Sequence, residues 1–324
     1  PTKPVPPVTK TCMGRWIFPL EVGEFASIVG PRPARNHGMN VSIGMNMLLW
    51  GTVITRTHIP CFQALKEAGF DGVEIPVNRQ GDAELRAMAA ACDALGLRRT
   101  ASAFVGVDAN PISPDATIRA AAVDSLKQSV DEAVLIGAER LIGGMYQAHK
   151  YFTGAGPTED EWRWSAECLR EVGEYAGSAG LELGLEVLNR FEVFLVNTAA
   201  DCLRLVEAIG LPNVGVHYDT HHANIEDMAP LQALRGAKAR LNHVHLSESH
   251  RGTLGTGQVD WNGTFDALKD VGYEGWLVIE AFGTADPDLA LAANVWREAF
   301  TSREEVYADG IHFIREQLRR VEAQ

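Results

Sequence analysis

The sequence has few cysteines, no cluster of basic residues and no long apolar run, and each of these absences excludes a class of protein. Its 5 cysteines are scattered over 324 residues without a CxxC pair. This spacing argues against a zinc knuckle, a redox dithiol and a disulfide framework, and it favours a reducing, cytoplasmic location. No apolar stretch approaches the roughly 20 residues of a membrane span, so we expect no membrane partner.

Negative charge prevails over positive charge. The chain carries 42 Asp and Glu against 29 Lys and Arg, a formal net charge of −13 at pH 7. Phosphate binding rests on clustered Lys and Arg, and no basic stripe is present, so this balance argues against a nucleic-acid partner. A hydrophobic content of 46% with 22% charged residues is typical of a globular protein with a large core. We therefore expect an enzyme that acts on a small neutral molecule.

Proline is concentrated in the first 38 residues, which show no sustained periodicity. We expect residues 1–38 to form a flexible, poorly ordered extension and residues 39–324 to form one catalytic domain. The prolines of this first segment are Pro1, Pro4, Pro6, Pro7, Pro19, Pro31 and Pro33.

From Val41 onward, strand-like apolar runs alternate with amphipathic helical segments. Eight such units predict a parallel sheet that closes into a (β/α)8 TIM barrel, an α/β fold. A doubly wound sheet is the alternative, but it needs a Gly-rich turn after its first strand, and Leu48–Gly51 is not one. The predicted strands are Val41–Leu48, Gly72–Val77, Arg99–Val105, Arg140–Gln147, Glu182–Leu188, Val214–Thr220, Leu241–Glu248 and Gly275–Phe282. The predicted helices include Ile59–Ala68, Thr117–Ile136, Glu159–Ala179, Ala199–Ile209 and Thr264–Val271.

Polar side chains stand at the ends of the last four predicted strands: Glu186, Asp219, His245 and Glu280. Catalytic groups of such a barrel sit at the C-terminal ends of its strands. These four residues are separated by about one β/α unit of roughly 30 residues each, so neighbouring strands would bring them around one point.

The simpler interpretation of Glu186 or Glu280, each within an apolar run, is a salt-bridged interior carboxylate. Buried carboxylates are costly unless they are paired or bound to a metal. Because an Asp and a His stand at the equivalent positions of the two other strands, four unrelated buried polar residues are a poor explanation. Three carboxylates and one imidazole favour Mn²⁺, Mg²⁺ or Co²⁺ over a Cys-rich Zn²⁺ site. The sequence therefore predicts that these residues hold one divalent metal ion.

Other residues near these strand ends have less specific signals. We interpret His217 and His243, each two residues before a predicted ligand, as core histidines with satisfied hydrogen bonds. His149 has two interpretations that stay open, a pocket residue or an exposed loop histidine. Trp50, at the end of the first strand, is interpreted as a pocket wall.

Around the predicted ligands the sequence resembles the ketose 3-epimerases, the D-tagatose/D-allulose 3-epimerase group of the xylose-isomerase-like superfamily. The resemblance covers the barrel from about Ile43 to the last helix and is strongest from Glu182 to Phe282. The combination of four motifs in order is specific for the family and far less specific for a substrate. These motifs are Leu185–Glu192 (LEVLNRFE), Asp219–Glu226 (DTHHANIE), His243–Glu248 (HVHLSE) followed by Arg251, and Gly272–Glu280 (GYEGWLVIE).

The resemblance implies that the four ligands bind one divalent ion, typically Mn²⁺. It further implies that Glu192, His222 and Arg251 contact a sugar near its carbonyl end. Taken alone, these three would be an exposed Glu, a loop His and a surface Arg. It also suggests a homodimer or homotetramer. Asn46 stands where the family carries an aromatic residue, so the pocket wall formed by Asn46 and Trp50 is more polar and the substrate stays open.

The activity that the resemblance implies is inversion of C3 in a free ketose through a cis-enediolate. The C3 hydrogen lies beside the C2 carbonyl, and a metal at O2 and O3 would polarise that carbonyl and stabilise the enediolate. Glu186 and Glu280, on opposite faces of C3, would remove one proton and return another. His222 and Arg251 would steady the negative charge on oxygen, and Glu192 would orient hydroxyl groups.

Several other functions use the same groups. An aldose–ketose isomerase, a hydroxypyruvate isomerase, and a lyase or epimerase acting on a 3-keto-glycoside all need a proton removed beside a carbonyl. A DNA-repair endonuclease of the same superfamily would need more His ligands and a positively charged groove, against the charge of −13. A catalytically inactive sugar-binding subunit would be expected to lack Glu186 or Glu280, and both are present.

Overall fold

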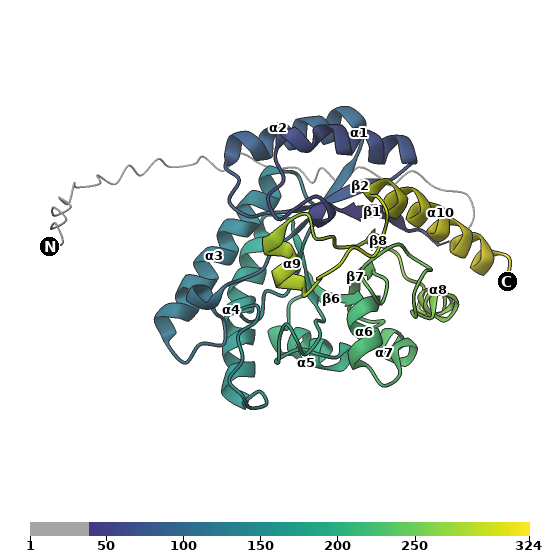
Figure 1. Ribbon diagram of the computed structural model, residues 1–324. Helices are drawn as coiled ribbons and strands as arrows, with labels where there is room; N and C mark the ends of the chain where they lie inside the picture. Colours follow the sequence, from purple (N-terminus) through teal and green to yellow (C-terminus); the bar gives the residue numbers. More distant parts are fainter. Residues whose placement is uncertain (1–38) are drawn as a thin grey trace, which may run out of the picture. The chain divides into compact units, whose positions relative to one another are not determined.

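A computed structural model describes residues 39–324, so the predicted extension at residues 1–38, with Cys12, lies outside the described residues. Eight parallel strands form a closed barrel in sequence order, and β8 pairs with β1 to close it. Figure 1 shows the helices arranged around these strands. The predicted (β/α)8 barrel is confirmed. The strands are β1 (Ser42–Asn46), β2 (Gly72–Pro76), β3 (Arg98–Ser102), β4 (Arg140–Gly143), β5 (Glu182–Glu186), β6 (Val214–Asp219), β7 (Leu241–Leu246) and β8 (Trp276–Ile279).

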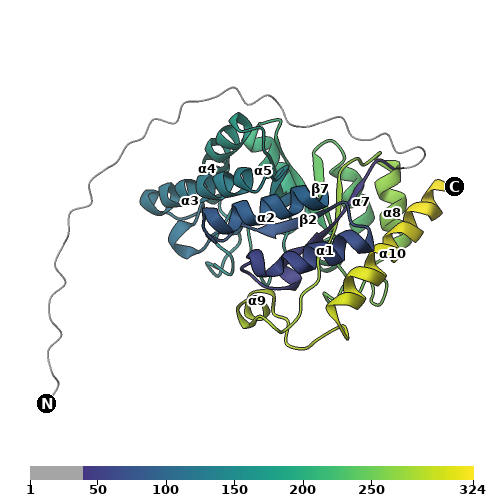
Figure 2. The same cartoon turned by 90° about the horizontal axis from the view of Figure 1, so that it is seen from above.

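The helices pack on the outside of the barrel, and α10 closes their ring by lying against α1 and α8 (Figure 2). Local sequence sets where they begin: Thr158 and Glu161 form a capping box at α4, and Thr198 and Asp201 form one at α5. The helices are α1 (Ile59–Ala68), α2 (Asp82–Leu95), α3 (Ala116–Leu135), α4 (Glu159–Ser178), α5 (Ala199–Ile209), α6 (Thr220–Glu226), α7 (Pro230–Gly236), α8 (Trp261–Asp270), α9 (Pro287–Ala293) and α10 (Arg303–Glu322). No helix described in residues 39–324 combines the length and apolar character needed to cross a bilayer.

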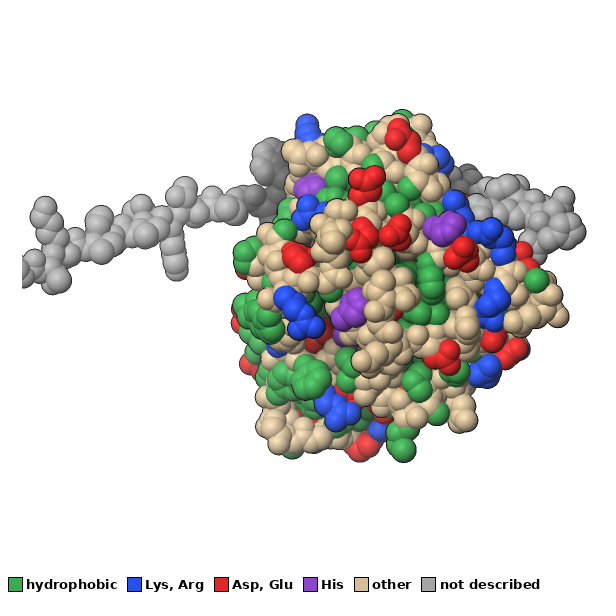
Figure 3. Space-filling model, turned by 45° about the vertical axis from the view of Figure 1, so that its right-hand side comes forward, with side chains coloured by type: hydrophobic (Ala, Val, Ile, Leu, Met, Phe, Trp, Pro, Cys, Tyr) green, Lys and Arg blue, Asp and Glu red, His purple; other side chains and the backbone are tan. Residues whose placement is uncertain are grey.

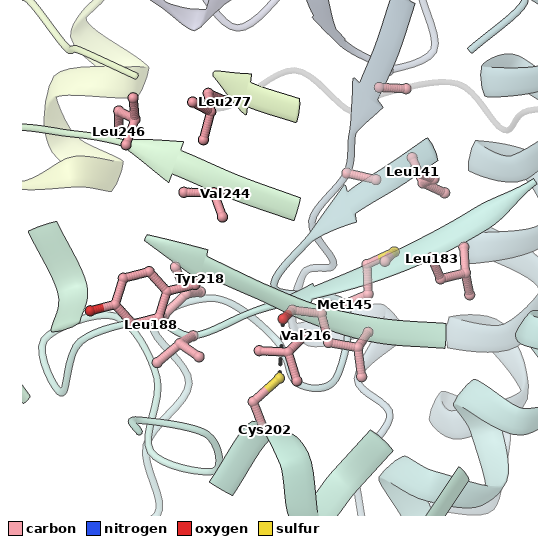
Figure 4. Packing of buried hydrophobic residues seen from close by; sticks show 14 of the residues in the cluster. Leu141, Met145, Leu183, Leu188, Cys202, Val216, Tyr218, Val244, Leu246 and Leu277 are labelled. Atoms are coloured by element: carbon pink, nitrogen blue, oxygen red, sulfur yellow. Dashed lines mark hydrogen bonds between the residues drawn. The ribbon is translucent and has the colours of Figure 1, made fainter. Parts of the chain in front are cut away.

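Alternation along the strands separates an apolar layer from a polar barrel interior. Leu183, Val216, Val244 and Leu277, on β5 to β8, belong to the buried hydrophobic cluster of Figure 4. Burying each such side chain contributes about 1.5–3 kcal/mol. Because successive residues of a strand face opposite sides, the residues next to these four point into the barrel. The polar side chains of the last strands therefore face one another inside it.

All eight strands end one to four residues earlier than the sequence pattern predicts, and at β1 and β4 the physical reason is plain. The predicted strand Val41–Leu48 stops at Asn46, whose side chain accepts a hydrogen bond from the Leu48 N–H and starts a short 3-10 helix, Met47–Leu49. The predicted strand Arg140–Gln147 stops at Gly143, which has a φ of +128°. A Cβ there would lie 2.3 Å from the Ala103 carbonyl oxygen, so only glycine fits.

Candidate active site

The four predicted ligands meet at the C-terminal mouth of the barrel. Glu186 ends β5, Asp219 ends β6, His245 is the penultimate residue of β7, and Glu280 directly follows β8. All four residues are buried. One potential metal-binding atom of each residue lies within 4.8 Å of those of the other three. Residues far apart in the sequence thus form one compact donor set because they occupy the same end of adjacent parallel strands.

The imidazole of His245 lies among the three carboxylates. Its Nδ1 is 3.3 Å from Glu280 Oε1, and 3.7 Å from both Asp219 Oδ2 and Glu186 Oε1. Burial, followed by the negative charge of Glu280, raises the pKa of Glu186 well above its usual range. A divalent cation would neutralise this crowding, and three carboxylates with one imidazole suit a hard divalent ion. The residues present therefore fit the predicted metal ion.

Arg251 spans the top of this cluster. Its Nη1 donates to Glu280 Oε2 at 2.7 Å, to Asp219 Oδ2 at 3.2 Å and to Ser247 Oγ at 2.8 Å. Its Nη2 lies 2.9 Å from His222 Nε2, and only 4% of the residue is exposed. Without the family resemblance, Arg251 would have been interpreted as a surface residue, and that interpretation is wrong. Instead, Arg251 joins two of the predicted ligands to a predicted substrate residue.

The Arg251 loop is organised by Glu248, to which the sequence assigned no role. The carboxylate of Glu248 is buried and accepts the Ser249 N–H at 2.8 Å, the Gly255 N–H at 3.0 Å and the Trp261 Nε1–H at 2.9 Å. Arg251 itself has a φ of +63°, the left-handed region that a side chain rarely adopts. The only sequence signal was that Glu248 follows the histidine motif.

Glu192 and His222 lie beside the cluster, linked by Asn189. The Asn189 N–H donates to His222 Nδ1 at 3.0 Å, and Asn189 Nδ2 donates to Glu192 Oε1 at 2.8 Å. His149 Nε2 lies 3.2 Å from Glu192 Oε2, so His149 is not an exposed loop histidine, and its role as a pocket residue stays a prediction. Burial alone would raise the pKa of Glu192, but the hydrogen bond from His149 and the charges of His222 and Arg251 lower it to about 2. Both Glu192 and His222 are buried, unlike the exposed Glu and loop His of the simpler interpretation.

The two residues predicted as pocket walls have different surroundings. Asn46 is 1% exposed, and its Nδ2 donates to Glu74 Oε1 at 3.0 Å and to Glu280 Oε1 at 2.9 Å. Trp50 follows the short helix after β1, is half-buried, and stacks on Tyr307 with ring centroids 6.4 Å apart. Their contacts with a substrate stay a prediction.

Glu74 is the functional candidate that the sequence analysis missed. It lies on β2, is fully buried, and its Oε1 is 2.6 Å from His245 Nε2. Burial alone would raise its pKa, but the charges of His245 and His243 lower the pKa below its usual range. The signal was available, since Glu74 is a carboxylate within the apolar run Val73–Ile75, as Glu186 and Glu280 are in theirs.

The two interior histidines are both buried, and neither has a hydrogen-bond partner within residues 39–324. His243 Nε2 lies within ion-pair distance of Glu74 Oε2, at 3.0 Å, but the hydrogen bonds expected for His243 are not formed. For His217 the expected satisfied hydrogen bonds are wrong, because within residues 39–324 neither ring nitrogen has a partner. Its imidazole packs on the His245 ring with centroids 4.0 Å apart, and burial lowers its pKa well below the usual range. It is therefore held as a neutral ring.

A cavity of about 710 Å³ opens beside Glu192. It is lined by the exposed rings of Phe191 and Trp296 and by Arg190 and Asn294. On the face shown in Figure 3, acidic, basic and hydrophobic side chains are interspersed. Of the predicted substrate residues, Glu192 lines this cavity.

Residues 62–317 match the family model described as xylose isomerase-like TIM barrel. The chain belongs to this family.

Curated relatives lie within the same family. The chain is 35% identical to the L-ribulose 3-epimerase of Mesorhizobium japonicum over 258 residues, which cover 79% of this chain and 86% of that protein. It is 33% identical over 285 residues to the ketose 3-epimerase of Arthrobacter globiformis, covering 86% and 97%. A solved structure of L-ribulose 3-epimerase aligns with a TM-score of 0.83 and 32% identity, covering 87% and 96%. The resemblance to ketose 3-epimerases is confirmed.

Proposed function

We propose that this chain is a metal-dependent ketose 3-epimerase that inverts C3 of a free ketose. One observation carries the proposal: two buried glutamates, Glu186 and Glu280, lie with Asp219 and His245 in a single donor set. The two curated relatives named above are 3-epimerases of L-ribulose and of ketoses, and the chain covers most of their length. The ion we propose is Mn²⁺, with Co²⁺ or Mg²⁺ as alternatives, because these ions suit carboxylate-rich sites.

The two glutamates divide the proton transfer. A bound divalent ion supplies polarisation of the substrate carbonyl and stabilises negative charge on the adjacent oxygens. One glutamate removes the C3 proton, and the other delivers a proton to the opposite face, so the configuration inverts. Their roles exchange with the configuration of the substrate, which requires both to be competent.

The residues around the glutamates orient the substrate. Arg251 and His222 lie 2.9 Å apart and are proposed to stabilise negative charge that develops on the sugar oxygens. Glu192, held by Asn189 and His149, is proposed to accept hydrogen bonds from sugar hydroxyls. Asn46 and Trp50 stay proposed as walls of the same pocket.

The location and assembly belong to the same proposal. Cys61, Cys92, Cys168 and Cys202 are free thiols, as a reducing cytoplasm would keep them. A homodimer or homotetramer is proposed on the family resemblance, and analytical ultracentrifugation of the purified chain tests it.

Proton NMR of a ketose panel in D₂O, with purified protein and Mn²⁺, tests the activity. Fructose, allulose, tagatose, sorbose, ribulose and xylulose cover the free ketoses of interest. Deuterium at C3 with accumulation of the epimer, both stopped by EDTA, is the expected result. Exchange at C1 instead would identify an aldose–ketose isomerase. A metal-loaded protein that exchanges none of these sugars would contradict the proposal and favour a 3-keto-glycoside.

A further inference from the structure

Beneath the proposed metal site, Glu74 has three hydrogen-bond partners and a fourth group, His243, at ion-pair distance. Its Oε1 accepts from Asn46 Nδ2 at 3.0 Å and lies 2.6 Å from His245 Nε2. Its Oε2 accepts from Thr100 Oγ1 at 2.8 Å and lies 3.0 Å from His243 Nε2. The side chain is 0% exposed, so water does not compete for these contacts. The arrangement follows from the barrel register, in which Asn46, Glu74 and Thr100 are partners on adjacent strands.

This carboxylate determines which nitrogen of His245 is left for a cation. An ionised carboxylate only accepts hydrogen bonds, so the nitrogen facing it must carry a hydrogen. The nitrogen 2.6 Å from Glu74 is Nε2. The other nitrogen, Nδ1, points at the carboxylate cluster, 3.3 Å from Glu280 Oε1, and has no hydrogen-bond partner within residues 39–324. Glu74 therefore presents Nδ1 as the metal-binding atom.

Asn46 links the same carboxylate to Glu280. An amide nitrogen has two hydrogens, and those of Asn46 are directed to Glu74 Oε1 and Glu280 Oε1, at 3.0 and 2.9 Å. Its Oδ1 accepts the Leu48 N–H at 2.8 Å, which fixes the orientation of the amide. Both hydrogens of Asn46 are thus committed to carboxylates. One of these carboxylates, Glu280, is a proposed metal ligand.

We propose that Glu74 and Asn46 are positioning residues for the metal centre. Glu74 sets the tautomer and ring orientation of His245, and Asn46 holds the Glu280 carboxylate at a fixed distance from the same group. His245 on β7 and Glu280 after the neighbouring strand β8 are thereby coupled through one buried carboxylate on β2. This inference rests on the proposed metal-dependent function. It adds Glu74, which is neither a proposed ligand nor a proposed substrate contact, and it gives Asn46 a second role. Carboxylate partners of metal-binding histidines typically change metal affinity by 10–100-fold when they are mutated.

Glu74→Gln tests the proposal, because it keeps the shape and removes the charge that fixes the His245 tautomer. Thr100→Val is the matched control, since it removes a hydrogen bond to the other oxygen of Glu74 and leaves the His245 and Asn46 contacts. The readouts are the Mn²⁺ dissociation constant and the visible absorption spectrum of the Co²⁺-loaded full chain. We expect Glu74→Gln to weaken Mn²⁺ binding by about 10–100-fold and to shift the Co²⁺ bands. The control is expected to stay within about twofold.

Asn46→Leu provides a second test that does not depend on Glu74→Gln folding. It keeps the side-chain size and removes both N–H donors, so the Co²⁺ bands are expected to shift through the altered position of Glu280. Circular dichroism verifies the fold of each variant. Unchanged Mn²⁺ affinity and Co²⁺ spectra in folded Glu74→Gln and Asn46→Leu would overturn the proposal.

The number of ions bound gives a further outcome. The donor atoms of His217, His243 and His245 also lie within 4.8 Å of one another. Two Mn²⁺ or Co²⁺ ions per chain would overturn the proposal, because an ion would then occupy the nitrogens assigned to Glu74. These readouts do not depend on turnover. If the variants change Mn²⁺ affinity and the Co²⁺ bands as expected but the unaltered chain shows no C3 exchange, only the 3-epimerase activity is refuted. If the unaltered chain shows C3 exchange but the variants leave metal binding unchanged, only the positioning role is refuted.

Discussion

The two glutamates of the site share a residue type and a depth in the barrel, but their surroundings differ. Glu280 is held on both oxygens, by Asn46 at 2.9 Å and by Arg251 at 2.7 Å. Within the described residues, Glu186 has only longer contacts, at 3.7 Å to His245 Nδ1 and 3.8 Å to His222 Nε2. The β8 side of the site is therefore tightly bonded, and the β5 side is not.

The difference shows how one pair of carboxylates can be prepared for opposite tasks. Burial and the charge of Glu280 raise the pKa of Glu186, so a proton is retained there more readily in the metal-free protein. Hydrogen bonds from Asn46 and Arg251 fix the position of the Glu280 carboxylate. A raised pKa, as at Glu186, suits a carboxyl group to a general-acid role.

The largest expected effect comes from removing either glutamate. Glu186→Gln and Glu280→Gln are each expected to lower kcat for C3 epimerisation by about 10²–10⁴-fold, because each supplies an acid–base step. The measurement is C3 deuterium exchange of the ketose, with circular dichroism as the control for folding. A folded Glu280→Gln protein that retained substantial turnover would end the two-glutamate mechanism.

Arg251 tests whether the β8 side depends on its bonded network. Arg251→Met leaves Glu280 and Asp219 buried without their cation, so the free energy of unfolding is expected to fall by about 3–5 kcal/mol in urea denaturation. Arg190→Met, which removes a partner of Glu226 at 2.8 Å from an exposed position, is the control. It is expected to shift the midpoint far less. Equal shifts in the two variants would show that Arg251 is not structurally coupled to the site.

Metal removal tests what the two sides share. At a free Mn²⁺ concentration of about 100 times the dissociation constant, bound ion is expected to add ~2.7 kcal/mol to the free energy of unfolding, and EDTA to remove it. This increment is expected to shrink in both Glu186→Gln and Glu280→Gln, since both are proposed ligands. Thermal unfolding with and without the ion measures it. An unaltered chain whose Tm ignores Mn²⁺ and EDTA would refute the metal site.

The smallest expected effect is at Asp227, the residue that follows α6. Burial raises the pKa of Asp227 from 3.8 to about 6, and its Oδ2 has no hydrogen-bond partner within residues 39–324. The folded chain holds this proton more tightly than the unfolded chain. The contribution of Asp227 is therefore present at low pH and is lost as pH rises through about 6. The Tm of Asp227→Asn should fall less between pH 4 and 6 than that of the unaltered chain, and parallel curves would contradict this assignment.

The fold and the clustering of the four proposed ligands were predictable because they depend on short-range pattern. Strand and helix periods repeat along the chain, and a carboxylate within an apolar run, as in Glu186 and Glu280, stands out locally. Strand ends were less predictable. The end of β1 depends on the Asn46 side chain capping the next turn, and that of β4 on the approach of Ala103 to Gly143.

The supporting contacts were not predictable, because their partners are distant in sequence. Glu74 and His245 are separated by 171 residues and meet only once the barrel closes. The same holds for His149 and Glu192, whose 3.2 Å contact argues against an exposed His149. Glu248 accepts five hydrogen bonds from its own loop and from Trp261. These depend on a backbone path that no local sequence pattern encodes.

The alternation along β7 has a consequence for how this protein can vary in evolution. His243 and His245 point into the barrel, while Val244 and Leu246 pack outside it. Deleting one residue between the start of β7 and His243 would turn both imidazoles into the apolar layer and both aliphatic side chains into the ligand set. Insertions and deletions among homologues should therefore be confined to the loops and helices. A given strand should differ between homologues only by substitution.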